Sequence, residues 1–220
     1  TMSKHLHIIS FNVPYPPDYG GVMDVFYKLV ALHAYGIKIT LHCFEYGRKE
    51  ADVLNQICHQ VFYYKREHSF RDFTSPTPYI VKTRKSSELL KNLAVDEAPI
   101  LFEGLHTCYY LSHDEIKNRL KTVRMHNVEW DYYRHLGKNE TSMFRRFYFF
   151  TESIKLKNFE KILTNADHLL PISKNDHEYL LKKFDNVTWL PAFHPNEEVL
   201  SLPGKGTYVL YHGNLSVVEN

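Results

Sequence analysis

The sequence has few cysteines and no long apolar run. Its three cysteines, Cys43, Cys58 and Cys108, are too few and too scattered for a disulfide framework or a zinc knuckle. Cys43 and Cys108 lie in or beside apolar runs, which predicts buried free thiols. No stretch is long and apolar enough to span a bilayer. The first apolar run carries His5 and His7, which argues against a signal peptide. We therefore expect a protein of the reduced cytoplasm.

Neither sign of charge dominates, because 27 basic and 25 acidic residues leave a formal net charge of only +2. Nothing global therefore points to a nucleic-acid partner. Hydrophobic residues make up 44% and charged residues 24% of the chain, an ordinary globular composition that excludes intrinsic disorder. Aromatic residues are abundant, with 16 Tyr, 14 Phe and 2 Trp, and there are 14 His. Such side chains suit surfaces that are half apolar and half hydrogen-bonding.

Short apolar runs alternate with helical segments along most of the chain. Seven runs are predicted as strands, at residues 5–13, 38–46, 60–64, 99–104, 122–126, 168–173 and 187–190. Helical segments separate most of them, and the longest is expected from about residue 142 to 166. Strands that alternate with helices favour a mostly parallel sheet covered by helices on both faces. The pattern therefore predicts an α/β fold.

The last part of the chain indicates a second domain. An irregular stretch with three prolines spans residues 191–203, and a predicted strand at 207–212 follows it, with a glycine turn at 213–216. A single strand and turn cannot bury themselves. We expect residues 1–194 to form one domain, and residues 195–220 to form a linker and the first strand of a truncated C-terminal domain.

Ligands of open parallel sheets bind at the carboxyl ends of the strands, so the residues after each predicted strand are candidates for a site. The first candidate is the proline-rich turn at 14–21, where Gly20 and Gly21 precede a helix. Adjacent glycines at a helix start let backbone N–H groups approach a phosphate, and the helix dipole favours that anion. A plain strand-to-helix turn would also use glycine. The spacing is neither that of a dinucleotide fingerprint nor that of a P-loop.

Three further candidates follow later strands. His126 ends the fifth predicted strand, where an imidazole can donate to a sugar hydroxyl or stabilise developing charge; the alternative is a structural histidine. Glu103 ends the fourth, where it could hold an acceptor hydroxyl or act as a base, or simply be an acid at the next helix start. Ser173 is expected to cap a helix at 175–184, although a cap can also face a cleft.

Two basic segments have competing interpretations. Residues 143–161 mix aromatic with basic side chains, and such a helix can lie on an anionic membrane. The alternative is a helix that faces the core and has a solvated basic side. The charge run at 82–85 is expected to be a solvated face.

Four segments, in order along the chain, carry a family resemblance. They are the strand, proline-rich turn, glycine pair and helix at 9–36; the histidine motif at 125–129; residues 166–173, similar to "ad-x-x-x-x-iS"; and residues 210–215, similar to "fxGxl". Together they resemble glycosyltransferase family 4, whose members have the GT-B fold. The resemblance covers the N-terminal domain and only the first strand of the second domain. Residues 216–220 depart from it, because many relatives have a longer glycine turn with a basic residue there.

The resemblance implies a Rossmann-like parallel sheet that faces a second such domain across a cleft. It also implies a retaining transfer of a sugar from a nucleotide-diphosphate sugar donor to a glycan or lipid-linked acceptor, with no metal and no cofactor. A lipid-linked acceptor would fit a peripheral contact with the inner face of the membrane. The family's paired glutamates and basic phosphate clamp belong to the second domain, so the isolated fragment is expected to be inactive.

The resemblance also assigns roles to residues. His126 is expected to be catalytic, lying beside the transferred sugar and stabilising the transition state. The expected donor- and acceptor-binding residues are Gly20, Gly21, Glu103, Asn127 and Ser173, with the two glycines approaching the donor diphosphate. Two alternatives stay open: a sugar-nucleotide epimerase of the GT-B type, and a non-catalytic binding domain that has kept the fold. A nucleotide-binding regulator is disfavoured by the lack of the usual phosphate-binding motifs.

Overall fold

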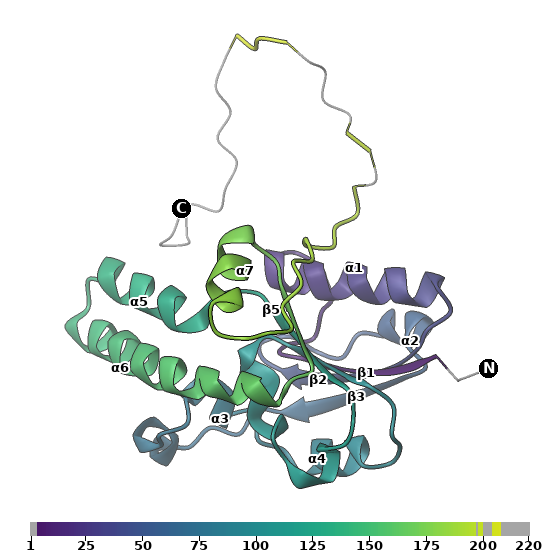
Figure 1. Cartoon of the computed structure of the whole chain (residues 1–220), viewed down its shortest axis with the longest axis horizontal. Coiled ribbons are helices and arrows are strands. Elements are labelled where there is room, and N and C mark those ends of the chain that lie inside the picture. Colours follow the sequence, from purple (N-terminus) through teal and green to yellow (C-terminus); the bar gives the residue numbers. More distant parts are fainter. Residues whose placement is uncertain (1–3, 197, 200–203, 208–220) are drawn as a thin grey trace.

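The computed structural model describes residues 4–196, 198–199 and 204–207. Six parallel strands form its centre (Figure 1): β1 (His5–Ser10), β2 (Lys38–Glu45), β3 (Gln60–Lys65), β4 (Ile100–Glu103), β5 (Lys121–Met125) and β6 (His168–Pro171). They lie in the order β3-β2-β1-β4-β5-β6. The chain runs from β1 outward to β3 and then returns to start β4 on the other side of β1. Ligands of open α/β sheets bind outside the carboxyl ends of the strands at such a switch point.

Helices cover both faces of the sheet because neighbouring strand residues point in opposite directions. Ile8 belongs to one apolar cluster, which packs under α1 (Gly20–Ala34) and α2 (Leu54–Ile57). Ile9 belongs to the other, which includes buried residues of α3 (Tyr79–Lys82), α4 (Ser87–Leu93) and the later helices. Six consecutive residues of β2 are buried, as expected of a strand covered on both sides. The predicted α/β, Rossmann-like architecture is confirmed.

The later helices are α5 (Glu129–Asn139), α6 (Met143–Phe159) and α7 (Lys174–Leu181). Short 3-10 helices are η1 (Phe70–Thr74), η2 (Leu105–Tyr110), η3 (Asp114–Ile116) and η4 (Glu160–Asn165). α5 and α6 pack side by side as a hairpin that extends away from the sheet (Figure 1). The long helix predicted at 142–166 is therefore α6 followed by the tighter turns of η4.

The seventh predicted strand, at 187–190, is wrong. Val187 forms only an isolated parallel bridge with Leu169 of β6. The N–H groups of Thr188 and Leu190 donate to the carbonyls of Leu169 and Pro171. Pro171 ends β6 and has no N–H group to donate back, so the ladder is incomplete. The carbonyl of Leu190 is bonded to the side chain of Arg124.

All three cysteines are free and buried, as predicted for Cys43 and Cys108. Burial raises the pKa of the Cys58 thiol to about 12, and it raises the pKa values of the other two as well. Among the residues that the structure describes, no helix has both the length and the apolarity needed to cross a membrane.

The division at residues 194 and 195 stays a prediction. Residues 191–196 have no helix or strand, and neither do 198–199 and 204–207. The strand predicted at 207–212 lies outside the described residues except for Thr207, and the turn predicted at 213–216 lies wholly outside them.

Candidate functional site

A cavity of about 750 Å³ opens at the carboxyl ends of the central strands. Its lining includes Phe11 after β1, Tyr46 after β2, His106 after β4 and His126 after β5. Hydroxyl groups are abundant in the lining, which contains Tyr19, Tyr46, Tyr79, Tyr132, Tyr133 and Tyr148. The volume lies within the range of pockets that bind small molecules. Aromatic faces with polar tips suit a ligand that has both a flat apolar part and hydroxyl groups.

Gly20 and Gly21 lie in the cavity wall, where α1 begins. A Cβ atom added at Gly21 would come within 2.9 Å of the ring of Phe11, whereas the same atom at Gly20 would meet nothing within 4 Å. The first N–H groups of a helix have no partner within the helix, so they are available to a ligand. The positive end of the helix dipole also lies here, which favours an anion.

His126 lies in the cavity wall and is oriented from behind by Glu103. The Nε2 atom of His126 lies 3.0 Å from Glu103 Oε2. Burial by itself raises the pKa of Glu103, but the nearby Lys28 charge and the bond from His126 hold it below its ordinary value. Glu103 is therefore an anion, and it can only accept a hydrogen bond. The Nε2 atom of His126 must then carry the proton that is donated to Glu103. Within the described part of the chain no hydrogen bond occupies Nδ1, which a ligand can therefore use.

A left-handed glycine makes this arrangement possible. Gly104 follows Glu103 directly and has φ +76°, a conformation that side chains disfavour. A Cβ atom there would lie 3.0 Å from Nδ1 of His106 and 3.8 Å from Cδ2 of His126. Only glycine lets the chain turn sharply after β4 while both imidazoles stay close to it.

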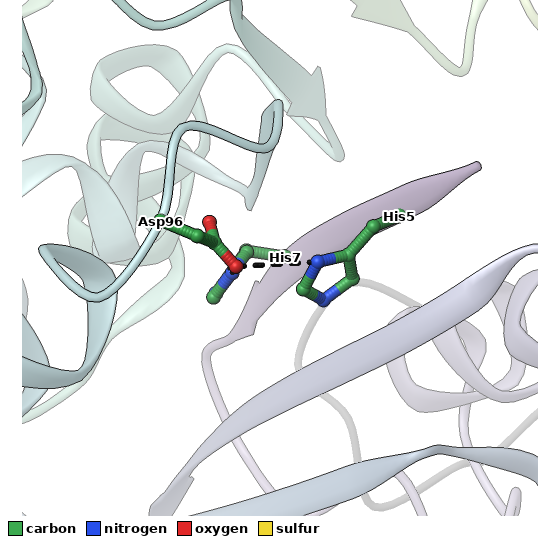
Figure 2. A group of neighbouring side chains, drawn as sticks. All are labelled: His5, His7 and Asp96. Carbon is green, nitrogen blue, oxygen red and sulfur yellow. Dashed lines mark hydrogen bonds and ion pairs between the residues drawn. The ribbon is translucent and has the colours of Figure 1, made fainter. Parts of the chain in front are cut away.

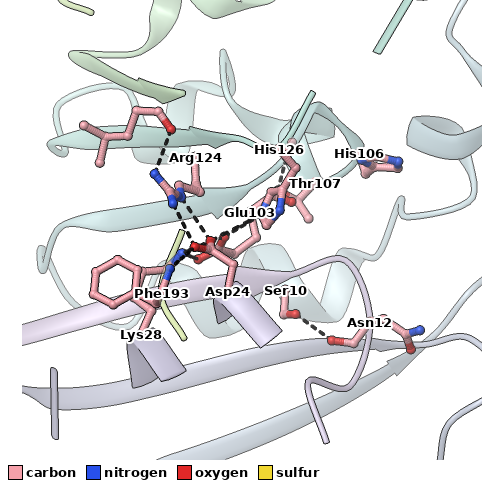
Figure 3. A network of polar contacts seen from close by, with 12 residues as sticks. Ser10, Asn12, Asp24, Lys28, Glu103, His106, Thr107, Arg124, His126 and Phe193 are labelled. Atoms are coloured by element: carbon pink, nitrogen blue, oxygen red, sulfur yellow. Dashed lines mark hydrogen bonds and ion pairs between the residues drawn. The ribbon is translucent and has the colours of Figure 1, made fainter. Parts of the chain in front are cut away.

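Beneath His126 lies a network of four buried charges (Figure 3). Arg124 contacts Asp24 with two nitrogens, Nε at 3.0 Å from Oδ2 and Nη2 at 2.7 Å from Oδ1. Lys28 Nζ lies 2.8 Å from Asp24 Oδ2 and 2.9 Å from Glu103 Oε1. All four side chains are at most 4% exposed. The two carboxylates balance the two cations, which reduces the cost of burial.

The network favours the ionised form of Asp24. Burial by itself raises the pKa of this carboxyl, but the bonds and charges of Arg124 and Lys28 lower it below its ordinary value. The ligand-type groups Asp24, Glu103 and His126 lie within 4.8 Å of one another, as metal ligands would. Both carboxylates are already paired with the two cations, so the arrangement favours ion pairing over metal binding.

The same network anchors the segment that leaves the sheet. Arg124 donates from Nη1 to the carbonyl of Leu190 at 2.5 Å and from Nη2 to that of Pro191 at 2.9 Å. The backbone N–H of Phe193 donates to Asp24 Oδ1 at 2.9 Å. Lys28 Nζ lies 5.5 Å from the centre of the Phe193 ring, a cation–π distance. The exit of the chain and the support of His126 therefore share residues.

Two arginines, Arg66 and Arg84, also line the cavity. Arg84 is 4% exposed and donates to the carbonyls of Phe11, at 2.9 and 3.1 Å, and of Ile80, at 2.5 Å. Burial lowers the pKa of Arg84 to about 9. The expectation of a solvated charge run at 82–85 is therefore wrong at Arg84 and at Thr83, which is fully buried and accepts from Arg66 at 2.7 Å. The cause is tertiary: α3 turns this arginine inward to bond the loop after β1.

Glu129 and His106 form an unusual pair in the same wall. Glu129 Oε1 and His106 Nδ1 lie 3.7 Å apart, and both atoms are buried without a hydrogen-bond partner among the residues that the structure describes. Burial raises the pKa of Glu129 to about 8 and lowers the pKa of His106 well below its ordinary value. Near neutral pH this pair is therefore uncharged, and its unused polar atoms can hydrogen-bond a ligand.

The structure brings together four of the six residues predicted for the site. Gly20, Gly21, His126 and Asn127 all line the cavity. Glu103 lies behind His126 and outside the lining. Ser173 is also outside the lining, and as predicted it caps α7, where it accepts from the N–H of Asp176 at 3.0 Å.

The sequence patterns missed the residues that support these groups. Asp24 and Lys28 stand on the apolar face of α1 beside buried Val25 and Leu29, an anomaly visible in the sequence. Arg124 similarly interrupts the buried strand β5. A charge on an apolar face signals a buried partner, but it does not say which one.

Comparisons with known proteins support the fold. No protein-family model matches the chain. One similar protein is a curated Klebsiella pneumoniae protein, described as an uncharacterized 44.6 kDa protein in cps region. The two are 29% identical over an aligned length of 223 residues, which includes 97% of this chain. The solved structure of Phytolacca americana UGT2 complexed with UDP-2fluoro-glucose and pterostilbene matches 86% of this chain with a TM-score of 0.52 and 9% identity. At that identity the likeness concerns the fold alone. The chain spans about half the length of each, 56% and 54% respectively.

Replacing Asp24 with Asn should destabilise the protein by about 3–5 kcal/mol, because the change leaves buried cations without their partner. Urea unfolding at neutral pH measures this loss. The matched control is Asp18→Asn, since Asp18 also pairs with an arginine, Arg48, but its side chain is 55% exposed. The control should change stability by less than about 1 kcal/mol. An equal effect of both substitutions would contradict the structural role of the network.

Glu129 should make the protein less stable as the pH rises. Its pKa is about 8 in the folded chain and near the ordinary 4.5 when unfolded, so the folded state holds the extra proton between these values. Stability is therefore lost progressively from about pH 4.5 to about pH 8. Glu129→Gln should remove this part of the slope in urea unfolding measured across that range. Glu115→Gln, at an exposed site, should leave the slope as it is; an unchanged slope in Glu129→Gln would refute the assignment.

Proposed function

We propose that this chain is the acceptor-side domain of a retaining, family-4-like glycosyltransferase that transfers a sugar from a nucleotide-diphosphate sugar to a glycan or lipid-linked acceptor. The observation that carries the proposal is the cavity at the switch point of the sheet. There, His126 is held by a buried carboxylate and lies in the same wall as the start of α1. The roles of individual residues follow from this geometry.

The start of α1 would receive the donor diphosphate. Gly20 and Gly21 have no side chain over the start of the helix, where the first N–H groups and the helix dipole favour an anion. Arg66 and Arg84 add positive charge to the cavity lining. The tyrosine hydroxyls and Asn127 are suited to sugar hydroxyl groups, which both donate and accept.

His126 would act on the transferred sugar. Sugar transfer passes through a transition state in which positive charge develops on the sugar ring. Nδ1 can accept a hydrogen bond from a sugar hydroxyl, and the Glu103 anion stabilises positive charge through the ring. Glu103 would therefore be a positioning residue that acts through His126, because it does not line the cavity itself.

The comparisons add support at a coarser level. The UGT2 structure holds a UDP-sugar analogue and pterostilbene, so a protein of this fold can bind a sugar nucleotide beside a second ligand. The relative in a cps region suggests a role in polysaccharide synthesis, which fits a glycan or lipid-linked acceptor. The chain covers about half of both proteins. Partial coverage is compatible with a C-terminal domain, to which the proposal assigns the remaining donor contacts, with the domain boundary near residue 194.

The start of α6 supports a peripheral contact with the inner face of a membrane. Met143, Phe144 and Phe147 are 76%, 90% and 72% exposed, and Arg145 and Arg146 beside them are exposed as well. These residues lie at the tip of the α5–α6 hairpin, where α6 begins (Figure 1). Apolar side chains could enter the lipid while the arginines bind anionic headgroups. The C-terminal half of α6 instead buries Ser153 and Leu156 against the body.

His126→Ala in the full-length protein should lower sugar transfer at least about tenfold, which corresponds to about 1.4 kcal/mol of transition-state stabilisation. A panel of GDP- and UDP-sugars, assayed for hydrolysis and transfer, measures this loss. His33→Ala changes an exposed histidine at the far end of α1 and should leave the rate unchanged. A protein that consumes no donor and binds none would favour a non-catalytic domain. Conversion of one sugar nucleotide into another would favour an epimerase.

The double substitution Phe144→Ser and Phe147→Ser should weaken binding to vesicles that contain anionic lipid by more than tenfold, because each buried phenylalanine contributes about 1.5–3 kcal/mol. Vesicle sedimentation measures the bound fraction. Tyr35→Ser, which removes an aromatic side chain that is 80% exposed after α1, should not change binding. Equal binding by all three proteins, or no binding by the unmodified protein, would exclude α6 as the membrane contact.

A further inference from the structure

A second cluster of ligating side chains lies at the amino end of the sheet, away from the cavity (Figure 2). His5 and His7 stand on β1, and Asp96 lies in the loop that enters β4. Their ligating atoms lie within 4.8 Å of one another. The proposed transfer reaction uses none of these residues.

The distances fit a tetrahedral metal ion. Asp96 Oδ2 lies 3.1 Å from His7 Nε2 and 3.2 Å from His5 Nδ1. Four ligands at zinc's usual bond lengths of about 2.0–2.1 Å stand about 3.3 Å apart at the corners of a tetrahedron. The two distances from Asp96 Oδ2 are therefore already close to the spacing that an ion between the groups would require, and the two imidazole nitrogens lie within 4.8 Å of each other.

In each imidazole, the nitrogen that does not face Asp96 has a hydrogen-bond partner, which would fix the orientation of the ring for metal binding. His5 Nε2 lies 2.9 Å from Thr40 Oγ1, so a ring bound through Nδ1 can donate there. His7 Nδ1 lies 2.9 Å from Nε2 of buried His42, whose Nδ1 lies 2.8 Å from Tyr64 Oη. Metal-bound histidines almost always donate their second N–H in this way, which sets the tautomer and the orientation of the ring.

The Asp96 carboxylate is oriented by its Oδ1 atom. Oδ1 accepts from the N–H of Ala98 at 2.9 Å and lies 3.4 Å from Arg119 Nη2. Both oxygens lie 3.1 Å from His7 Nε2, and Oδ2 also lies close to His5 Nδ1. Arg119 repels a cation, so it lowers the affinity of the site while it fixes the carboxylate. A hollow of about 230 Å³ lined by these residues leaves room for water as a fourth ligand.

We propose that His5, His7 and Asp96 form a binding site for one Zn²⁺ ion that ties the start of β1 to the loop entering β4. Two imidazoles and one carboxylate are a ligand set that zinc accepts. The site is structural, because it lies at the opposite end of the strands from the cavity. Two segments that are 89 residues apart in sequence would be joined by the ion.

Zinc titration of the metal-stripped full chain by calorimetry tests the site. One ion should bind per chain, and Zn²⁺ should raise the melting temperature, because a ligand that binds only the folded state stabilises it. Thr40→Val, which removes the partner of His5 without touching a ligand, should weaken binding by about 10- to 100-fold. His5→Ala and Asp96→Asn should weaken it more. His33→Ala removes an exposed histidine elsewhere and should not change it.

Cobalt provides a readout that does not depend on stability. Co²⁺ bound in the same site should give the strong visible absorption of tetrahedral coordination, and this absorption should vanish in Asp96→Asn. His5 and Asp96 are partly exposed, so their variants should fold, which circular dichroism verifies. The proposal fails if the folded unmodified chain binds neither ion. It also fails if His5→Ala and Asp96→Asn bind Zn²⁺ as tightly as the unmodified chain does.

Discussion

The two-point contact between Asp24 and Arg124 is the interaction on which the candidate site depends. Both side chains are 0% exposed, so neither could be buried without the other. The pair joins α1 to β5, and Lys28 extends it to Glu103 at the end of β4. Because Glu103 holds His126, the orientation of an imidazole in the cavity wall derives from an ion pair located beneath it.

The same pair determines where the chain leaves the sheet. Arg124 uses its remaining donors on the carbonyls of Leu190 and Pro191, and Asp24 accepts from the N–H of Phe193. The N–H of Leu190 still donates to the carbonyl of Pro171 in β6 at 3.1 Å, so only the Leu190 carbonyl is taken by the cation. One shared network therefore fixes the segment after Leu190 relative to the groups that support His126. The buried charges therefore serve position more than stability, since an apolar core would be less costly to bury.

The sequence contained most of the framework and only part of the site. Continuous apolar runs predicted all six strands of the sheet, because strands covered on both faces are apolar throughout. The helical spacing of apolar residues predicted α1. Because ligands bind at the carboxyl ends of parallel strands, the predicted strand ends led to His126 and to the glycine pair. This reasoning could not find Arg84 or the role of Arg124. Arg84 bonds Phe11, 73 positions away, and Arg124 bonds Asp24, 100 positions away. The false strand at 187–190 has a different origin, because Pro171 at the end of β6 has no N–H group with which to complete the ladder.

Strand β1 illustrates how one fold can support two polar clusters. His5 and His7 lie near its amino end. Ile8 and Ile9 follow, and each belongs to one of the two apolar clusters that cover the faces of the sheet. The carboxyl end continues into Phe11 and the cavity. An apolar layer thus separates the histidine cluster from the candidate site. With the framework secured by that layer, the cavity can tolerate unpaired polar atoms on Glu129 and His106. Departures from full pairing are expected where a ligand completes the structure.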